Sequence, residues 1–244
     1  MKIFIFGISL LVVSLTTAWA EEPFAIVELF ASEGCSSCPP ADDLLRRLIQ
    51  EKGKRIYALS FEVDYWDYLG WKDPFSRPEF TQRQHRYAEV FRNSSVYTPQ
   101  MIINGQNAFV GSDEAQARKH INHFLKVPSA LSIDLKVELD QKDVLKVKYQ
   151  LDVLPKGAVI NFALVQHMAE IPVKSGENAG RTLIHGNVVL DFKTIELNAS
   201  QGELVFTSTS QMSMLNIVSV IAYIQDRQNM KILGAQVVDL ENNI

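Results

Sequence analysis

The sequence predicts an α/β domain with a helical insertion, followed by an all-β domain of the sandwich type. Two observations lead to this prediction. In the first half of the chain, mostly apolar runs flank a segment of helical periodicity, as in a parallel β–α–β unit. In the second half, apolar and polar residues alternate with a period of two over several short segments separated by turn residues, which is typical of antiparallel sandwiches.

The first 20 residues are expected to lie outside the fold. Lys2 precedes an apolar run over residues 3–13, and Ala18 and Ala20 form a small-x-small cleavage pattern. These are the features of a cleavable secretory signal peptide, and the apolar run is too short to span a membrane. We therefore expect a periplasmic or secreted protein without a membrane span, in a compartment where disulfides persist.

Charge argues against a nucleic-acid partner. The chain has 24 basic and 28 acidic residues, a formal net charge of −4, and it contains no basic run. Proteins that bind nucleic acid carry a basic patch or stripe, so no such partner is expected.

The α/β pattern begins directly after the predicted cleavage site. Residues 24–30 form a mostly apolar run, which predicts a buried and parallel strand. A loop with Cys35 and Cys38 follows, and residues 55–63 predict the next strand. Between them, apolar residues recur at helical spacing: Ala41, Leu44, Leu45, Leu48 and Ile49.

Residues 64–93 form the predicted insertion. It opens with closely spaced aromatic and acidic residues over 64–71, and a helix is predicted from Ser76, where Ser76 and Glu79 match a capping box. The aromatic residues, Trp66 among them, either pack the insertion onto the domain or form a substrate-binding lip beside the cysteines.

A strand, a hairpin and a helix complete the first domain. Thr98 and Pro99 precede an apolar run over residues 100–103, and the following Asn-Gly pair predicts a hairpin with its return strand at 107–110. A helix to about Lys126 comes next. The Thr98–Pro99 bond is either an ordinary trans turn before the strand or a cis bond, which would make a rigid turn.

The second domain is predicted to begin at residue 128. We expect a domain over residues 23–127 and a β-sandwich domain over residues 128–244, because the apolar period changes to two after a Val-Pro-Ser segment. The predicted strands span residues 131–139, 144–151, 158–166, 187–192, 203–208, 217–225 and 232–239.

Cys35 and Cys38, the two cysteines of the chain, are the strongest candidates for a chemical site. A disulfide between them closes a very small loop and so stabilises the fold little. At a helix N-terminus, free backbone N–H groups and the helix dipole stabilise a thiolate and lower its pKa. We expect Cys35 to attack and Cys38 to resolve the mixed disulfide. The alternative is a structural disulfide.

Other candidate residues lie in a polar loop, and no metal or cofactor is expected. Residues 177–181 and His185 lie between predicted strands, where Arg181 and His185 either approach the cysteines or belong to a surface or domain-docking loop. The five histidines show no metal-ligand spacing with the cysteines. The acidic residues of the insertion are interpreted as caps and turn residues: Asp64, Asp67 and Asp73.

The order strand, Cys-x-x-Cys, helix, strand, Thr-Pro, strand, Asn-Gly, strand and helix resembles the thioredoxin fold. The resemblance implies that the Thr98–Pro99 bond is cis and faces the cysteines, and that Thr98 offers backbone hydrogen bonds to a substrate strand. Two features depart from that family. Gly34, not tryptophan, precedes Cys35, and Glu28 lies one residue farther from the first cysteine than the buried aspartate of thioredoxin.

Four motifs together resemble domain-of-unknown-function family 1223 (DUF1223), a group of secreted bacterial proteins with a thioredoxin-like part. The motifs are ELFASEGCSSCPPAD, FEVDYWDYLGWKDPF, VYTPQMIING and GENAGRTLIHGNVV. This resemblance spans most of the mature chain and implies a fold rather than an activity.

These observations predict a periplasmic thiol–disulfide oxidoreductase that acts on thiols or disulfides of exported proteins or peptides. Its catalytic residues would be Cys35 and Cys38. Its substrate-binding residues would be Thr98, Pro99, Trp66, Arg181 and His185. The alternative is a non-catalytic exported binding module with an inert disulfide, and a buried Cys35 sulfur would favour that alternative.

Overall fold

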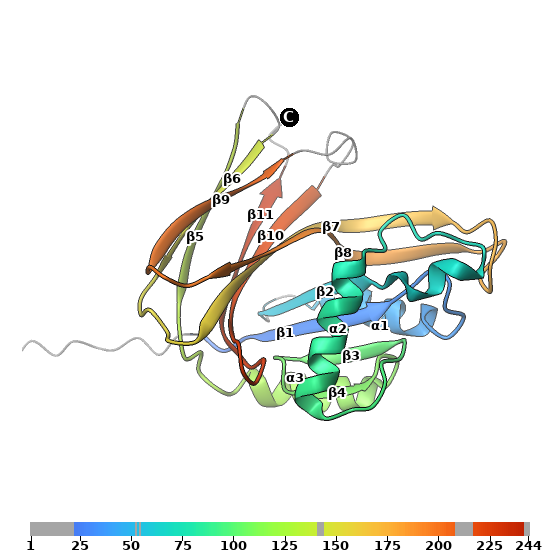
Figure 1. Ribbon diagram of the computed structural model, residues 1–244, viewed down its shortest axis with the longest axis horizontal. Coiled ribbons are helices and arrows are strands. Elements are labelled where there is room, and N and C mark those ends of the chain that lie inside the picture. Colours follow the sequence, from blue (N-terminus) through green and yellow to red (C-terminus); the bar gives the residue numbers. More distant parts are fainter. Residues whose placement is uncertain (1–21, 52, 54, 141–143, 208–216, 242–244) are drawn as a thin grey trace, which may run out of the picture.

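A large mixed β-sheet forms the centre of the fold (Figure 1). The computed structural model describes residues 22–51, 53, 55–140, 144–207 and 217–241 of the 244-residue chain, so the predicted signal peptide lies outside the described residues. The eight strands of the sheet, in the order in which they lie side by side, are β11 (Ile232–Glu241), β10 (Ile217–Asp226), β7 (Ala158–Pro172), β8 (Thr182–Glu196), β2 (Ile56–Glu62), β1 (Ala25–Ala31), β3 (Gln100–Ile103) and β4 (Asn107–Val110).

A second sheet and four helices complete the described structure. The three-stranded antiparallel sheet has the order β5 (Ile133–Leu139), β6 (Val144–Leu151) and β9 (Gln201–Thr207). The helices are α1 (Pro39–Ile49), the 3-10 helix η1 (Asp64–Leu69), α2 (Pro78–Phe91) and α3 (Glu114–Phe124). Within the described ranges, no helix combines the length and apolar character needed to cross a bilayer.

The predicted fold class is wrong. We expected a thioredoxin-like α/β domain with a helical insertion and a sandwich after it. The protein is instead mostly β, with 45% of its residues in strands and 21% in helices, around one eight-stranded mixed sheet. The strands β7, β8, β10 and β11 come from the second half of the chain and extend the sheet of the first half. The predicted division of the chain at residue 128 stays a prediction.

Most strands lie where the sequence pattern predicts them, but β7 and β8 extend well beyond the predicted ranges 158–166 and 187–192, so His185 lies within β8 and not in a loop. The partners of the strands do not follow from the pattern. Apolar periodicity identifies a strand and its buried face, and it carries no information on which strand pairs with it. The two halves of the sheet meet where β2 pairs with β8 in parallel, at Ser60 and Val188. The side-chain amide of Asn187 donates to the backbone carbonyl of Ala58 at 3.0 Å and strengthens this join.

Two cores lie on opposite faces of the sheet around β1, whose residues are all buried. Val27 and Leu29 pack on one face with α1, α3 and both cysteines. Ile26 and Phe30 pack on the other face against α2. Figure 1 shows α2 in front of the sheet, with α1 and α3 behind it. A third core fills the space between the three-stranded sheet and the strands β7, β8 and β10.

The insertion helix starts two residues later than predicted. α2 begins at Pro78, with Arg77 as the N-cap residue, so Ser76 does not cap it. The Ser76 hydroxyl donates instead to the Asp67 carboxylate at 2.8 Å. Proline is favoured in the first turn of a helix, where its missing N–H has no partner to lose, and this explains the start at Pro78.

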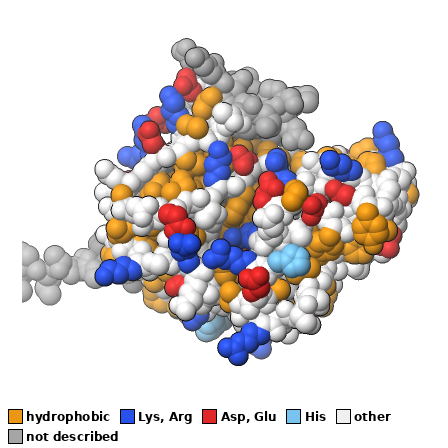
Figure 2. Space-filling model, viewed as in Figure 1, with side chains coloured by type: hydrophobic (Ala, Val, Ile, Leu, Met, Phe, Trp, Pro, Cys, Tyr) orange, Lys and Arg blue, Asp and Glu red, His pale blue; other side chains and the backbone are white. Residues whose placement is uncertain are grey.

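Charges are mixed on the molecular surface. Figure 2 shows acidic and basic side chains interspersed over the face that carries α2. This distribution agrees with the small net charge of the chain.

Candidate functional site: a buried disulfide and an acidic cluster

Cys35 and Cys38 form a disulfide at the N-terminus of α1, with their Cα atoms 5.5 Å apart. Cys38 is the N-cap residue, and its carbonyl accepts from the N–H groups of Ala41 at 2.8 Å and Asp42 at 3.2 Å. The helix periodicity that begins at Ala41 therefore places the disulfide where the sequence predicts it.

Both cysteines are buried. Cys35 is 0% exposed and Cys38 is 1% exposed, although Ser36 and Ser37 between them are exposed. The Ser37 hydroxyl lies 3.3 Å from the Cys35 sulfur, and it must be the donor because a disulfide sulfur carries no hydrogen. The Cys35 sulfur thus lies directly beneath one exposed side chain.

Thr98 and Pro99 lie beside the first turn of α1, and the peptide bond between them is cis. The Pro99 carbonyl accepts from the Gly111 N–H at 2.9 Å. A Cβ atom added to Gly111 would lie 3.0 Å from the Pro99 side chain and 3.2 Å from the Ala41 side chain. Pro99 is therefore close to the turn that Cys38 begins.

Trp66 joins the insertion to this proline loop. Its indole N–H donates to the Thr98 hydroxyl at 2.8 Å, and its half-buried ring packs against the core that contains both cysteines. This arrangement matches the packing interpretation of Trp66, and a Cβ atom added to Gly34, the residue before Cys35, would lie 3.0 Å from Trp66 Cβ.

The loop between β7 and β8 covers the disulfide from another side. The Asn178 amide donates to the carbonyls of Glu33 at 2.8 Å and Cys35 at 3.0 Å. The Glu177 carboxylate accepts from the Ser36 N–H at 3.0 Å. Arg181 is exposed, and its guanidinium donates to the Asn178 side chain at 2.8 Å. From the sequence, Arg181 was the residue of this loop expected to approach the cysteines, whereas the buried side-chain amide of Asn178 makes the contact with the Cys35 backbone.

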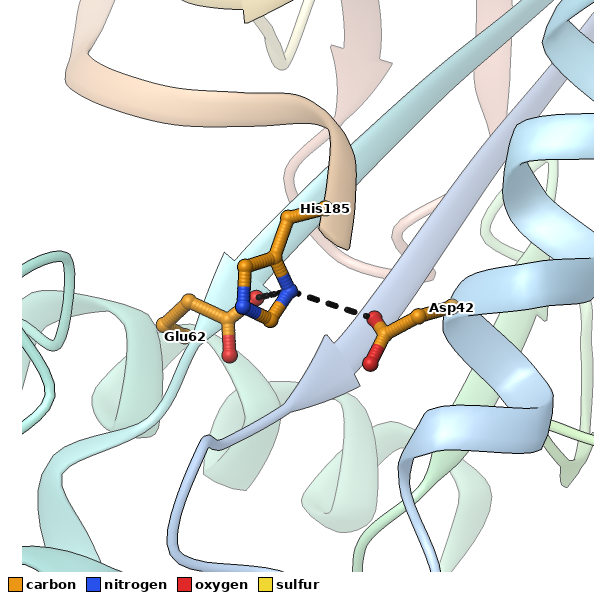
Figure 3. Close-up of side chains that lie close together, drawn as sticks. All are labelled: Asp42, Glu62 and His185. Atoms are coloured by element: carbon orange, nitrogen blue, oxygen red, sulfur yellow. Dashed lines mark ion pairs between the residues drawn. The ribbon is translucent and has the colours of Figure 1, made fainter. Parts of the chain in front are cut away.

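His185 lies at the centre of a cluster of buried carboxylates (Figure 3). Its Nδ1 atom is 3.6 Å from Asp42 Oδ1 and 3.9 Å from Glu62 Oε1. Its Nε2 atom is 3.4 Å from Glu33 Oε1. Burial alone would lower the pKa of His185, but the nearby carboxylates of Asp42, Glu33 and Glu62 favour the charged ring and raise the pKa well above its usual value.

Three elements converge to build this cluster. Asp42 comes from the first turn of α1, Glu62 from the end of β2, and His185 from β8. The residue after His185 allows β8 to approach α1. A Cβ atom on Gly186 would lie 2.8 Å from Ile49 Cδ1 and 2.9 Å from Arg46 Cγ, so a larger residue would push the strand and the helix apart.

Two residues of the insertion, Trp71 and Asp73, form hydrogen bonds with Glu33 of the cluster. The Trp71 indole N–H donates to Glu33 Oε2 at 2.6 Å, and the Asp73 carboxylate accepts from the backbone N–H of Glu33 at 2.9 Å. Burial and the charge of Glu33 raise the pKa of Asp73 to about 6. Burial and the charge of Asp73 raise the pKa of Glu62 well above its usual range. The negative charges of these neighbouring buried carboxylates therefore repel one another.

Sequence reasoning identified His185 in this cluster and missed its acidic partners. The available signal was a charged residue at a position that the pattern assigns to the core. Asp42 falls between the inward-facing residues Ala41 and Leu44, and Glu62 stands near the end of an apolar strand. Sequence alone did not show that these two positions converge on His185.

Glu28 lies on the opposite face of the sheet and does not contact the cysteines. Its carboxylate accepts from the Arg83 guanidinium at 2.7 Å, from the Tyr223 hydroxyl at 2.8 Å and from the Tyr87 hydroxyl. Adjacent residues of a strand point to opposite faces, so the one-residue offset from the thioredoxin position turns this acid toward α2. Glu28 cannot accept a proton from Cys38 in this arrangement.

The fold and the site define a class: a mostly β protein with a disulfide at a helix N-terminus and a buried cluster of one histidine and several carboxylates. The chain belongs to the family described as "Protein of unknown function (DUF1223)", whose pattern matches residues 26–225. Among curated proteins, none matches this chain.

Solved structures include one that is similar over nearly the whole chain. Protein AGR_C_4864 from Agrobacterium tumefaciens is 26% identical, with a TM-score of 0.68, over 92% of this chain and 97% of that chain. A domain of the outer membrane lipoprotein Omp28 from Porphyromonas gingivalis is 15% identical, with a TM-score of 0.31, over 46% of this chain and 97% of that chain. The first similarity supports the fold. The second, with a TM-score of 0.31, is too weak to serve as evidence.

Proposed function

We propose that this protein is a thiol–disulfide oxidoreductase that acts on exported proteins or peptides through Cys35 and Cys38. The position of the disulfide carries the proposal. It spans only two residues, so it adds little to the stability of the fold, and it stands at the N-terminus of α1, where the helix dipole has its partial positive charge. This partial charge would stabilise a thiolate at Cys35 in the reduced protein.

The proposed reaction proceeds through a mixed disulfide. The Cys35 thiolate attacks one sulfur of a substrate disulfide, forms a Cys35–substrate disulfide and releases one substrate thiolate. The Cys38 thiolate then attacks the Cys35 sulfur, forms the Cys35–Cys38 disulfide and releases the second substrate thiolate. Two electrons pass from the cysteine pair to the substrate, and oxidation of a substrate dithiol follows the reverse path.

Four neighbouring residues are assigned to substrate binding in this proposal. Thr98 and Pro99 lie beside the first turn of α1, and Trp66 is bonded to Thr98. These three residues would hold a substrate strand next to the cysteines. Arg181 is exposed above Asn178 and would contact the substrate from the other side. His185 is buried, so it would not touch the substrate and is left out of this set.

A specific observation favours a second function. The Cys35 side chain is fully covered, so a substrate sulfur reaches it only if Ser37 and its neighbours move. The second candidate is accordingly a non-catalytic exported binding module in which the disulfide is inert.

Insulin reduction in the presence of dithiothreitol separates the two functions. We expect the wild-type protein to accelerate precipitation of the insulin B chain, Cys35→Ser to show only the background rate, and Cys38→Ser to accumulate a mixed disulfide with the substrate. A wild-type rate equal to background, with a Cys35–Cys38 bond that resists dithiothreitol in the folded protein, would instead support the binding module.

The proposed location is the periplasm or the exterior of the cell. It depends on the signal-peptide pattern of residues 1–20, and N-terminal sequencing of the protein from the exported fraction tests it. We expect the mature chain to begin at Glu21. A chain that retains Met1 and stays with the cytosolic fraction would contradict this location.

A further inference from the structure

We propose that Asp42, Glu62 and His185 bind a divalent transition-metal ion, with Zn²⁺ as the ion that fits best. One imidazole nitrogen and two carboxylate oxygens form a mixed ligand set that suits zinc. Three protein ligands also leave one coordination position open to a further ligand. This inference does not depend on the redox activity of the cysteines.

The spacing of the three side chains fits a shared ion better than it fits hydrogen bonds. One ligand atom from each residue lies within 4.8 Å of the others. The distances from His185 Nδ1 are 3.6 Å to Asp42 Oδ1 and 3.9 Å to Glu62 Oε1, which is too long for hydrogen bonds. Two ligands of a tetrahedral zinc ion with bonds of about 2.1 Å lie about 3.4 Å apart.

Several buried polar atoms of this site have no hydrogen-bond partner among the described residues, although Glu62 Oε1 accepts from the Ser60 hydroxyl at 2.8 Å. The atoms without a partner are both ring nitrogens of His185, Asp42 Oδ1 and Glu62 Oε2. All three side chains are at most 6% exposed. Buried polar atoms normally have partners, and the buried carboxylates here outnumber the one imidazole that lies among them, which leaves negative charge uncompensated. A divalent cation between these atoms would give them a partner and compensate this charge.

Glu33 completes the arrangement on the far side of the imidazole. Histidines that bind a metal through one nitrogen usually donate the other ring N–H to a carboxylate or carbonyl. Glu33 Oε1 lies 3.4 Å from His185 Nε2, and the Trp71 indole holds the other oxygen of Glu33 at 2.6 Å. Figure 3 shows the ring with Nδ1 toward Asp42 and Glu62, so Glu33 is placed to accept the Nε2–H of a ring that binds a metal through Nδ1.

A surface pocket borders this site at Asp42. The pocket measures about 170 Å³ and lies between the first turns of α1 and the start of β8. Its other lining residues include Asp43, Arg46, Arg181 and Thr182, and neither Glu62 nor His185 lines it. An ion that enters this pocket therefore comes close to the cluster on the side of Asp42.

Zinc titration of the chelator-treated mature protein tests the site. The Cys35–Cys38 disulfide is kept oxidised and checked with a thiol reagent, so that thiolates cannot bind the ion. We expect one Zn²⁺ per chain by calorimetry and a rise in melting temperature. Asp42→Asn, Glu62→Gln and His185→Gln should each weaken binding about 100-fold, and Glu33→Gln about 10-fold.

Asp43→Asn is the matched control, because Asp43 is the next residue of α1 and its exposed carboxylate pairs with Arg46 at the surface. It should bind zinc like the wild type. Absence of stoichiometric zinc binding would overturn the proposal, as would binding that survives Asp42→Asn and His185→Gln.

A measurement on the wild-type protein covers the case in which the variants fail to fold. In long-range ¹H–¹⁵N spectra, zinc should shift Nδ1 of one histidine only. That histidine is assigned to His185 by elimination, with variants of the other four: His85, His120, His123 and His167. Zinc binding that leaves His185 unshifted would refute the site.

Discussion

At the scale of single residues, the balance of charge rather than burial distinguishes the two faces of the sheet around β1. The cysteines lie on one face with a cluster of four acids and one histidine, while Glu28 forms a closed network with Arg83 on the other. Both sets are buried, but the Glu28 carboxylate has a cation beside it, and the cluster around His185 contains more acids than one imidazole can neutralise.

Ser37 provides a residue-scale test of the cysteine site. Its hydroxyl donates to the Cys35 sulfur, and a thiolate accepts such a bond more strongly than a thiol. In the reduced protein, Ser37→Ala should raise the pKa of Cys35 by about one unit. Thiolate absorbance at 240 nm against pH measures the change. Ser36→Ala is the control, and equal pKa values in Ser37→Ala and the wild type would show that the hydroxyl has no such role.

The Glu28–Arg83 pair gives a prediction of stability. Arg83→Met leaves the Glu28 carboxylate buried without its cation, which should lower the free energy of unfolding by about 3 to 5 kcal/mol. Urea unfolding measures this loss. Arg86→Met, an exposed arginine one residue before Tyr87 on the same helix, should lower it by less than about 1 kcal/mol. Similar losses in the two variants would show that Arg83 does not stabilise the fold by neutralising the buried Glu28 carboxylate.

At the scale of elements, close approaches of the backbone decide how the strands and helices fit together. The β3–β4 hairpin contacts the turn between β10 and β11, where the Asn104 carbonyl accepts from the Ile232 N–H at 3.1 Å. The hairpin turn itself was predicted from its Asn-Gly pair. Its contact with a turn more than 120 residues later in the chain was not, because local turn chemistry says nothing about distant neighbours.

Gly105→Ala tests this element contact. Gly105 has a positive φ of 65°, and an added Cβ atom would lie 1.9 Å from the Met230 carbonyl oxygen. The variant combines left-handed strain with a backbone clash, so we expect a loss of about 3 kcal/mol or more in the free energy of unfolding.

Gly157→Ala is the control for that substitution. Its φ of 70° is similar, and no atom lies within 4 Å of an added Cβ, so it carries the strain alone. We expect a loss of about 1 to 2 kcal/mol. Equal losses in the two variants would show that the clash with Met230 is relieved at little cost.

At the scale of the whole molecule, one apolar core contains residues from both ends of the described chain. Phe24 and Ile26 of the first half pack in the same cluster as Tyr223 and Ile232 of the last strands. A core shared in this way couples the unfolding of the parts that contribute to it.

We therefore predict a single unfolding transition for the mature protein. Trp66 and Trp71 are the tryptophans of the described residues, and both report on the first half of the chain. Their fluorescence and the far-ultraviolet circular dichroism should change at the same urea concentration. Two separate midpoints would instead support independent domains that divide near residue 128.

The sequence alone determined the positions of most strands, the helix that follows the cysteines and the turn at Asn104. These features depend on local periodicity, on turn residues and on proline, all of which act over a few positions. It also singled out His185, Thr98 and Trp66, although not for the contacts that they make.

Only the tertiary structure decided the fold class, the burial of Cys35 and the acidic cluster. The strands β7, β8, β10 and β11 join a sheet begun more than 100 residues earlier, and Asp42, Glu62 and His185 meet because α1, β2 and β8 converge. Pairing between distant strands depends on the surfaces that fit together in the folded chain. That fit depends on the whole molecule, so it cannot be predicted from any short stretch of the sequence.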